Sequence, residues 1–109
     1  LVNQAHPFTC ELTAEERQQW IRDIERLEKL GAEVIIPGHQ KPGMPFDSSS
    51  CSFTKDYLTA TEEAMAKTKD EGCFYYAMVQ RFPEANLFIS NEMNAGVFKG
   101  GKNWNWKDE

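Results

Sequence analysis

A surplus of positive charge is missing from this sequence. Its 109 residues include 12 lysines and arginines against 17 aspartates and glutamates, which leaves a net charge of −5 at pH 7. Nucleic acids and anionic membranes are bound through basic side chains that neutralise phosphates, so this balance argues against both. The charge therefore predicts no nucleic-acid partner and no membrane partner.

Long apolar runs are missing as well. No stretch approaches the roughly 18 apolar residues of a membrane-spanning helix, and no basic-then-apolar leader opens the chain. Cysteine is scarce: Cys10, Cys51 and Cys73 are far apart and odd in number, which fits reduced thiols better than a disulfide framework. We expect a soluble, cytoplasmic protein.

Histidine is scarcer still. Only His6 and His39 occur, so the sequence contains neither a His-x-His nor a His-Glu-x-x-His spacing. A hydrolytic zinc site takes about three protein ligands and keeps an open position for water. By itself the sequence therefore lacks the ligands of a dinuclear hydrolytic centre, and we predict no catalytic residue in the chain alone.

What is present is the composition of a globular domain. Hydrophobic residues make up 40% of the chain and charged residues 27%, and 109 residues suffice for one domain or part of one. The sequence opens at Leu1 rather than Met, with an apolar Leu1-Val2 pair that suits a strand in a sheet. We therefore expect residues 1–109 to form a single partial domain of a longer protein.

The clearest predicted element is a helix from Thr13 to Leu30. Thr13 and Glu16 have the spacing of a capping box, and Gly31 is a typical residue just past a helix end. Apolar residues recur on one face of this helix, while charged residues, Arg17 among them, are expected to decorate the rest. Periodicity predicts two further helices, over residues 53–71 and 83–97, the second beginning at Pro83. Residues 73–82 suit a helix or a strand by periodicity alone, and their alanine, methionine, glutamine and arginine, between two predicted helices, favour a helix.

A short β-branched run, Val34 to Ile36, follows the first helix and leads into Pro37-Gly38-His39. Such a run suits a strand buried on both faces, and the Pro-Gly pair ends it. His39 would then lie at the carboxyl end of a buried strand, where α/β folds commonly bind ligands. On spacing alone, a turn histidine bonded to backbone is the more common alternative. Together with a strand near Leu1, these elements predict an α-rich α/β fold with about four helices and one or two short strands.

The same stretch resembles a known family. A helix carrying Trp20, Ile24, Leu27 and Leu30, then Gly31, a β-branched strand and Pro37-Gly38-His39, is similar to the closing segment of the metallo-β-lactamase-fold hydrolases. The resemblance implies that residues 1–43 form this closing segment and residues 50–109 a helical C-terminal extension that covers the fold.

The resemblance also implies a role for His39, as the last metal-binding histidine of a zinc or iron site in the intact protein. A metal-bridging aspartate would lie immediately before Leu1, and the paired histidines would come from a missing N-terminal half. The chain alone would then be inactive. The resemblance does not identify a substrate, since related proteins act on lactams, thioesters, phosphodiesters and other esters.

Three alternatives remain open at this point. His6, Cys10, His39 and Cys51 could form a Cys2His2 zinc site, although Pro7 disfavours a helix that would align the first pair. The chain could instead be a helical interaction module without metal, such as a homodimer that exchanges strands with a second copy. Finally, Trp104 and Trp106 could dock an extended tail on their own domain or bind a partner.

Overall fold

The computed structural model describes residues 1–102. This part of the chain contains, in order, β1 (Val2–Asn3), α1 (Ala14–Lys29), β2 (His39–Gln40), α2 (Ser49–Lys67), α3 (Glu71–Arg81) and α4 (Phe88–Lys99). For these residues, the predicted α-rich fold with about four helices and one or two short strands is confirmed. The prediction for Trp104 and Trp106 concerns residues outside the described part.

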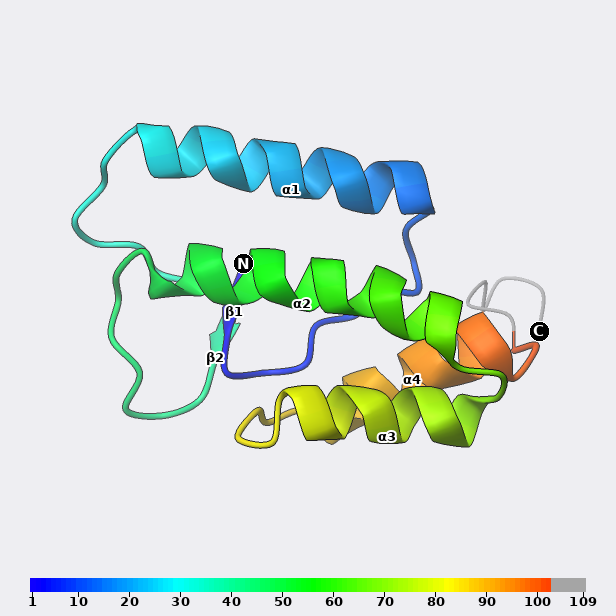
Figure 1. Cartoon of the computed structure of the whole chain (residues 1–109). Helices are drawn as coiled ribbons and strands as arrows, with labels where there is room; N and C mark the ends of the chain where they lie inside the picture. Colours follow the sequence, from blue (N-terminus) through cyan, green and yellow to red (C-terminus); the bar gives the residue numbers. More distant parts are fainter. Residues whose placement is uncertain (103–109) are drawn as a thin grey trace.

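Helix α2 is the central element. Figure 1 shows α1 along one side of α2, with α3 and α4 together on its other side and the two short strands beside its N-terminal half. The main core lies between α2, α3, α4 and the N-terminal segment; its largest fully buried members include Tyr57, Phe74 and Met78. A smaller cluster of Ile24, Cys51 and Leu58 joins α1 to α2. Among residues 1–102, no helix combines the length and the apolar character needed to cross a bilayer.

The N-terminus of α1 is built as predicted. The Thr13 hydroxyl accepts a hydrogen bond from the Glu16 amide at 3.2 Å, and the Glu16 carboxylate accepts one from the Thr13 amide at 3.1 Å. These two bonds satisfy amide donors that the helix itself leaves free. At the other end, Gly31 has a φ of +68°, a left-handed conformation that favours glycine. The capping box and the glycine stop are therefore confirmed.

The predicted buried strand at Val34 to Ile36 is wrong. The described chain has no strand there, and Val34 and Ile36 are 68% and 76% exposed. A strand buried on both faces needs hydrogen-bonded neighbours and a cover over each face. Among residues 1–102 these segments are lacking, so only Ile35 of the run packs inward, against the Ile24 cluster.

The sheet forms a few residues later instead. β1 and β2 pair in parallel, with Val2 opposite His39, and the Gly38 amide donates to the Leu1 carbonyl at 3.0 Å. The opposite edge of β1 is occupied by α2, because the Thr54 hydroxyl bonds both the amide and the carbonyl of Val2 at 3.0 Å. The predicted strand near Leu1 is thus confirmed, and Thr54 fixes its position.

Two predicted helix boundaries shift at the turn between α2 and α3. Helix α2 ends at Lys67, not at residue 71, and α3 begins at Glu71. The reason is Asp70, whose carboxylate accepts a hydrogen bond from the Cys73 amide at 2.8 Å and so starts a new helix. Gly72 consequently lies inside the first turn of α3.

Helix α4 starts at Phe88 rather than at Pro83. The residues between are held in a bridge to the N-terminal segment: the Asn86 amide donates to the Gln4 carbonyl at 2.8 Å, and the Asn86 carbonyl accepts from the His6 amide at 2.7 Å. A tertiary pairing therefore prevents the helix that proline alone would favour.

Candidate functional site

A cavity of about 370 Å³ opens beside the two strands and is lined by both histidines of the chain. It lies where the N-terminal segment, α1, β2 and the start of α4 meet. Its apolar walls include Leu1, Val2, Pro7, Trp20, Leu87 and Ile89. A concave, mostly apolar surface with a few polar groups is typical of small-molecule sites. A somewhat larger hollow of about 430 Å³ between α3 and α4 is lined by neither histidine.

His39 is an exposed residue on this cavity. The expectation that it follows a buried strand is wrong: it is the first residue of β2, and the preceding β-branched run is largely exposed. Its position comes instead from the parallel pairing, which sets it opposite Val2. The imidazole is accessible, so it is available as a single metal ligand or as a contact for a bound molecule.

His6 is the second histidine of the cavity and is fully buried. Its Nδ1 lies 2.6 Å from the Tyr57 hydroxyl oxygen, whereas its Nε2 has no hydrogen-bond partner among residues 1–102. Burial lowers the pKa of His6 from 6.5 to about 4, because the charged imidazolium would lose its hydration. The ring is therefore neutral at pH 7.

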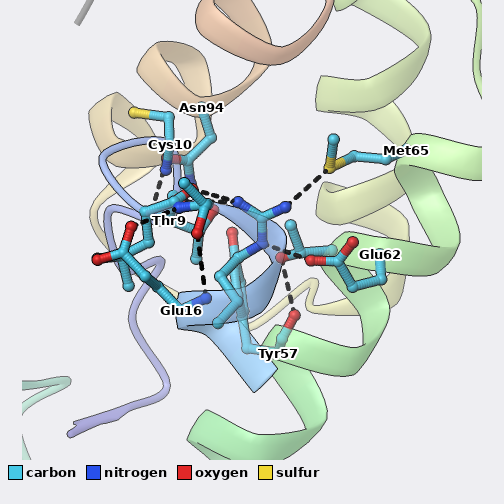
Figure 2. A network of polar contacts seen from close by, with 11 residues as sticks. Thr9, Cys10, Glu16, Tyr57, Glu62, Met65 and Asn94 are labelled. Atoms are coloured by element: carbon cyan, nitrogen blue, oxygen red, sulfur yellow. Dashed lines mark hydrogen bonds and ion pairs between the residues drawn. The ribbon is translucent and has the colours of Figure 1, made fainter. Parts of the chain in front are cut away.

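Asn94 of α4 holds the segment that carries His6. Its side-chain oxygen accepts hydrogen bonds from the Thr9 amide at 2.8 Å and the Cys10 amide at 3.1 Å, and its side-chain nitrogen donates to the Pro7 carbonyl at 2.8 Å. Figure 2 shows Asn94 pointing into this loop beside Thr9 and Cys10. One buried carboxamide thus satisfies three backbone groups of the loop, which would otherwise be buried without hydrogen bonds.

Arg17 secures the same loop from the side of α1. Contrary to the expectation of a solvated charge, it is only 2% exposed. Its guanidinium forms an ion pair with Glu62 of α2, donates to the Leu12 carbonyl at 2.6 Å, and lies 4.9 Å from the centre of the Phe98 ring. Periodicity could not distinguish this arginine from its exposed neighbours, because all of its partners come from other segments.

The Cys2His2 alternative is wrong. Among the described residues, no three histidine, cysteine, aspartate or glutamate side chains come together as a metal site would require. Cys10 is buried at the Asn94 loop, and burial raises its pKa to about 11, while Cys51 lies in the cluster between α1 and α2. A thiol with a raised pKa is a poor ligand and a poor nucleophile, so these cysteines act as small core residues.

Sequence reasoning found His39 through its motif but missed His6, Tyr57 and Asn94 as parts of one site. His6 and Tyr57 are 51 positions apart, and Asn94 is 87 positions from Pro7. Comparisons with models of protein families, with curated proteins and with solved structures found no match for this chain. The site therefore has to be interpreted from its own chemistry.

Proposed function

We propose that this chain is the closing part of a metal-dependent hydrolase that resembles the metallo-β-lactamase fold. In this proposal, His39 supplies one metal ligand through an imidazole nitrogen, and α2, α3 and α4 cover the fold. The observation that carries the proposal is the parallel pairing of β1 with β2, which brings an accessible histidine to a cavity at the start of β1. Zinc or iron is the metal that the resemblance implies.

The register of β1 against β2 supports a metal site shared by His39 and the residue that would precede Leu1. Because Val2 lies opposite His39 and Leu1 bonds Gly38, a residue preceding Leu1 would adjoin Pro37-Gly38. The resemblance expects the metal-bridging aspartate at that position. A carboxylate there would lie near the imidazole of His39, and an oxygen and a nitrogen donor are both suitable for zinc or iron.

The outer face of α1 and the segment after it also support the proposal. Leu27, Leu30, Val34 and Ile36 are 44%, 78%, 68% and 76% exposed. These four side chains lie within a short stretch of the sequence, and large exposed apolar patches are normally covered in a folded protein. The proposed N-terminal half of the fold would cover them.

The chain's own contribution to the chemistry would be limited to one ligand and one wall of the site. A bound metal lowers the pKa of a coordinated water towards 7, so that hydroxide is available at neutral pH. His39 would orient that metal, and the apolar cavity beside it would exclude water from the neighbouring part of a substrate. Residues 1–109 contain no paired histidines, so these ligands would have to come from another part of the protein.

The first test is the coding sequence upstream of Leu1. We expect an aspartate codon immediately before Leu1 and a paired-histidine loop further upstream. In that longer protein, His39→Ala is expected to remove about one metal ion per chain and the hydrolase activity, whereas Lys41→Gln, two positions away, leaves both intact. A start codon at Leu1, with no histidine loop before it, would overturn the proposal.

A second candidate is a helical interaction module that pairs with another copy of itself and binds no metal. The same four exposed apolar residues favour it, since a second copy could cover them. Sedimentation of the purified chain would then give a dimer, and Val34→Lys together with Ile36→Lys would give a monomer. A wild-type monomer at high concentration would contradict this candidate.

A further inference from the structure

One residue in the lining of the cavity beside His39, His6, has a polar atom without a partner in the described chain. The His6 side chain lines the cavity and is fully buried, yet its Nε2 has no partner among the described residues. A buried nitrogen without a hydrogen bond destabilises the folded chain. A bound molecule that supplies the missing partner would remove this cost.

The hydrogen-bond network determines what kind of partner Nε2 needs. Burial keeps Tyr57 protonated by raising its pKa, and a hydrogen bond with Asn94 opposes this only in part. The Asn94 oxygen already accepts from Thr9 and Cys10, so Asn94 approaches the phenol oxygen as a donor. The Tyr57 proton is then directed to Nδ1 of His6, and a neutral imidazole must carry its own proton on Nε2. We assign Nε2 as a hydrogen-bond donor, which requires an acceptor oxygen in the ligand.

The rest of the cavity restricts the ligand further. Its walls are mainly aliphatic and aromatic, with Trp20, Leu87 and Ile89 among them, and the carboxylate of Glu11 disfavours an anion. A volume of about 370 Å³ is at the small end of the usual range for ligand pockets. A compact, uncharged and mostly apolar molecule fits these conditions.

The start of α4 is strained where it borders the cavity. Leu87 has a φ of +62°, a left-handed conformation that is costly for leucine, and it makes no side-chain capping bond within the described chain. Leu87, Phe88 and Ile89 are nevertheless 41%, 49% and 64% exposed. Leu87 and Ile89 line the cavity, and backbone strain beside exposed apolar side chains of this kind is expected at a binding site.

We propose that this cavity binds a small uncharged molecule with an apolar body and one oxygen that accepts a hydrogen bond from His6 Nε2. Ketones, esters and alcohols with an aromatic or branched aliphatic group belong to this class. The inference goes beyond the proposed function because it requires no metal. If His39 does hold a metal, the same cavity would take the uncharged apolar group of the substrate.

The test compares two probes of nearly the same shape. Acetophenone carries a carbonyl oxygen, and α-methylstyrene has a methylene group in its place. Both are titrated into the ¹⁵N-labelled chain with a chelator present, so that the result is independent of any metal at His39. We expect acetophenone to bind about tenfold more tightly and to shift the Nε2 resonance of His6. Equal affinities, an unshifted Nε2, or no binding of acetophenone would each overturn the inference.

Variants locate the binding. Ile89→Lys places a charge on the cavity wall and is expected to weaken acetophenone binding at least tenfold, whereas Tyr76→Lys, an equally exposed apolar position on α3 outside the lining, leaves it unchanged. His6→Phe keeps the ring but removes Nε2 and is expected to equalise the two probes. If that variant does not fold, the comparison of the two probes on the wild-type chain still tests the inference. Equal loss in the Ile89 and Tyr76 variants would contradict binding in this cavity.

Discussion

The helices packed on the two sides of α2 differ in how completely they bury their own apolar residues. Towards α3 and α4, Tyr57, Phe74 and Met78 are at most 1% exposed. Towards α1, the contact formed by Ile24 is equally buried, but Leu27 of α1 and its C-cap residue Leu30 are 44% and 78% exposed. Apolar residues of a helix are thus almost completely buried on one side and partly exposed on the other, so the presence of a helix alone does not fix burial. What differs is whether the described chain provides a second surface to cover it.

Side-chain anchors differ in a similar way between the N-terminal loop and the connection after α1. In the N-terminal loop, Asn94 of α4 and Arg17 of α1 satisfy backbone groups. Residues 30–38 have almost no such anchors in the described chain, and the Ile35 amide bonds the Phe46 carbonyl at 3.0 Å within the connection between α1 and α2. The comparison predicts that stability resides in the α2–α4 side, and matched variants on the two sides can test this.

The largest contrast is expected between core and exposed apolar residues. Phe74→Ala should lower the free energy of unfolding by about 4 kcal/mol, because it leaves a cavity in the main core. Leu30→Ala, at a position 78% exposed, should change it by less than about 0.5 kcal/mol. Urea unfolding followed by circular dichroism measures both. A Leu30→Ala cost similar to that of Phe74→Ala would mean that another copy covers α1 in solution.

The next contrast is between the two histidines and concerns how stability depends on pH. Because the pKa of His6 falls from 6.5 to about 4 on folding, the unfolded chain takes up the proton first as the pH falls. The contribution of His6 to stability is therefore complete above about pH 6.5 and is lost progressively towards pH 4. The difference between these two pKa values corresponds to a loss of about 3 kcal/mol in the free energy of unfolding.

Urea unfolding at several pH values between about 7 and 4 would measure this loss. His6→Gln is expected to flatten the dependence, and His39→Gln, at the exposed histidine, is expected to preserve it. The carboxyl groups of Asp47 and Asp70 titrate lower, because hydrogen bonds with Ser49 and Cys73 lower their pKa values. An unchanged pH dependence in His6→Gln would contradict the assignment.

A smaller contrast concerns two ion pairs. Glu62→Gln removes the charge that faces the buried Arg17 and is expected to cost about 2 kcal/mol, because an unpaired guanidinium would remain largely out of water. Glu84→Gln removes the partner of Lys41, a pair that is 3.5 Å apart with Glu84 78% exposed, and should cost less than about 0.5 kcal/mol. Thermal unfolding of the two variants at equal ionic strength compares them; equal shifts would argue that Arg17 is hydrated in solution.

The smallest effect is expected at the helix caps. Here the variant in α1 should cost more stability than the variant in α2, the reverse of the contrast in burial. Thr13→Ala removes the capping box of α1, the less buried helix, and should cost about 1 kcal/mol. Ser48→Ala should be close to neutral, since Ser48 makes no side-chain capping bond in the described chain. Amide hydrogen exchange in the first turn of each helix would report the difference. Equal protection in both variants would show that α1 does not depend on its cap.

Sequence reasoning succeeded where the determining groups are neighbours in the chain. The capping box depends only on Thr13 and Glu16, and the helix stop depends only on the backbone conformation of Gly31. Both occur as expected. It failed at Val34 to Ile36, since burial of β-branched residues depends on a sheet and covering helices elsewhere. For the candidate site it found His39 by its Pro-Gly-His motif, but the reason for its position, the pairing with Val2, was not visible locally.

By itself, the sequence determined the helical character of the chain, the ends of α1, a strand at the N-terminus, and the shortage of histidine that limits any metal site within it. These features depend on charge, capping and composition, which act over a few residues. Tertiary structure alone decided that Arg17 and His6 are buried, that Asn94 joins α4 to the N-terminal loop, and that both histidines line one cavity. Each of these depends on contacts between segments far apart in the chain, and burial and hydrogen bonding are properties of such contacts.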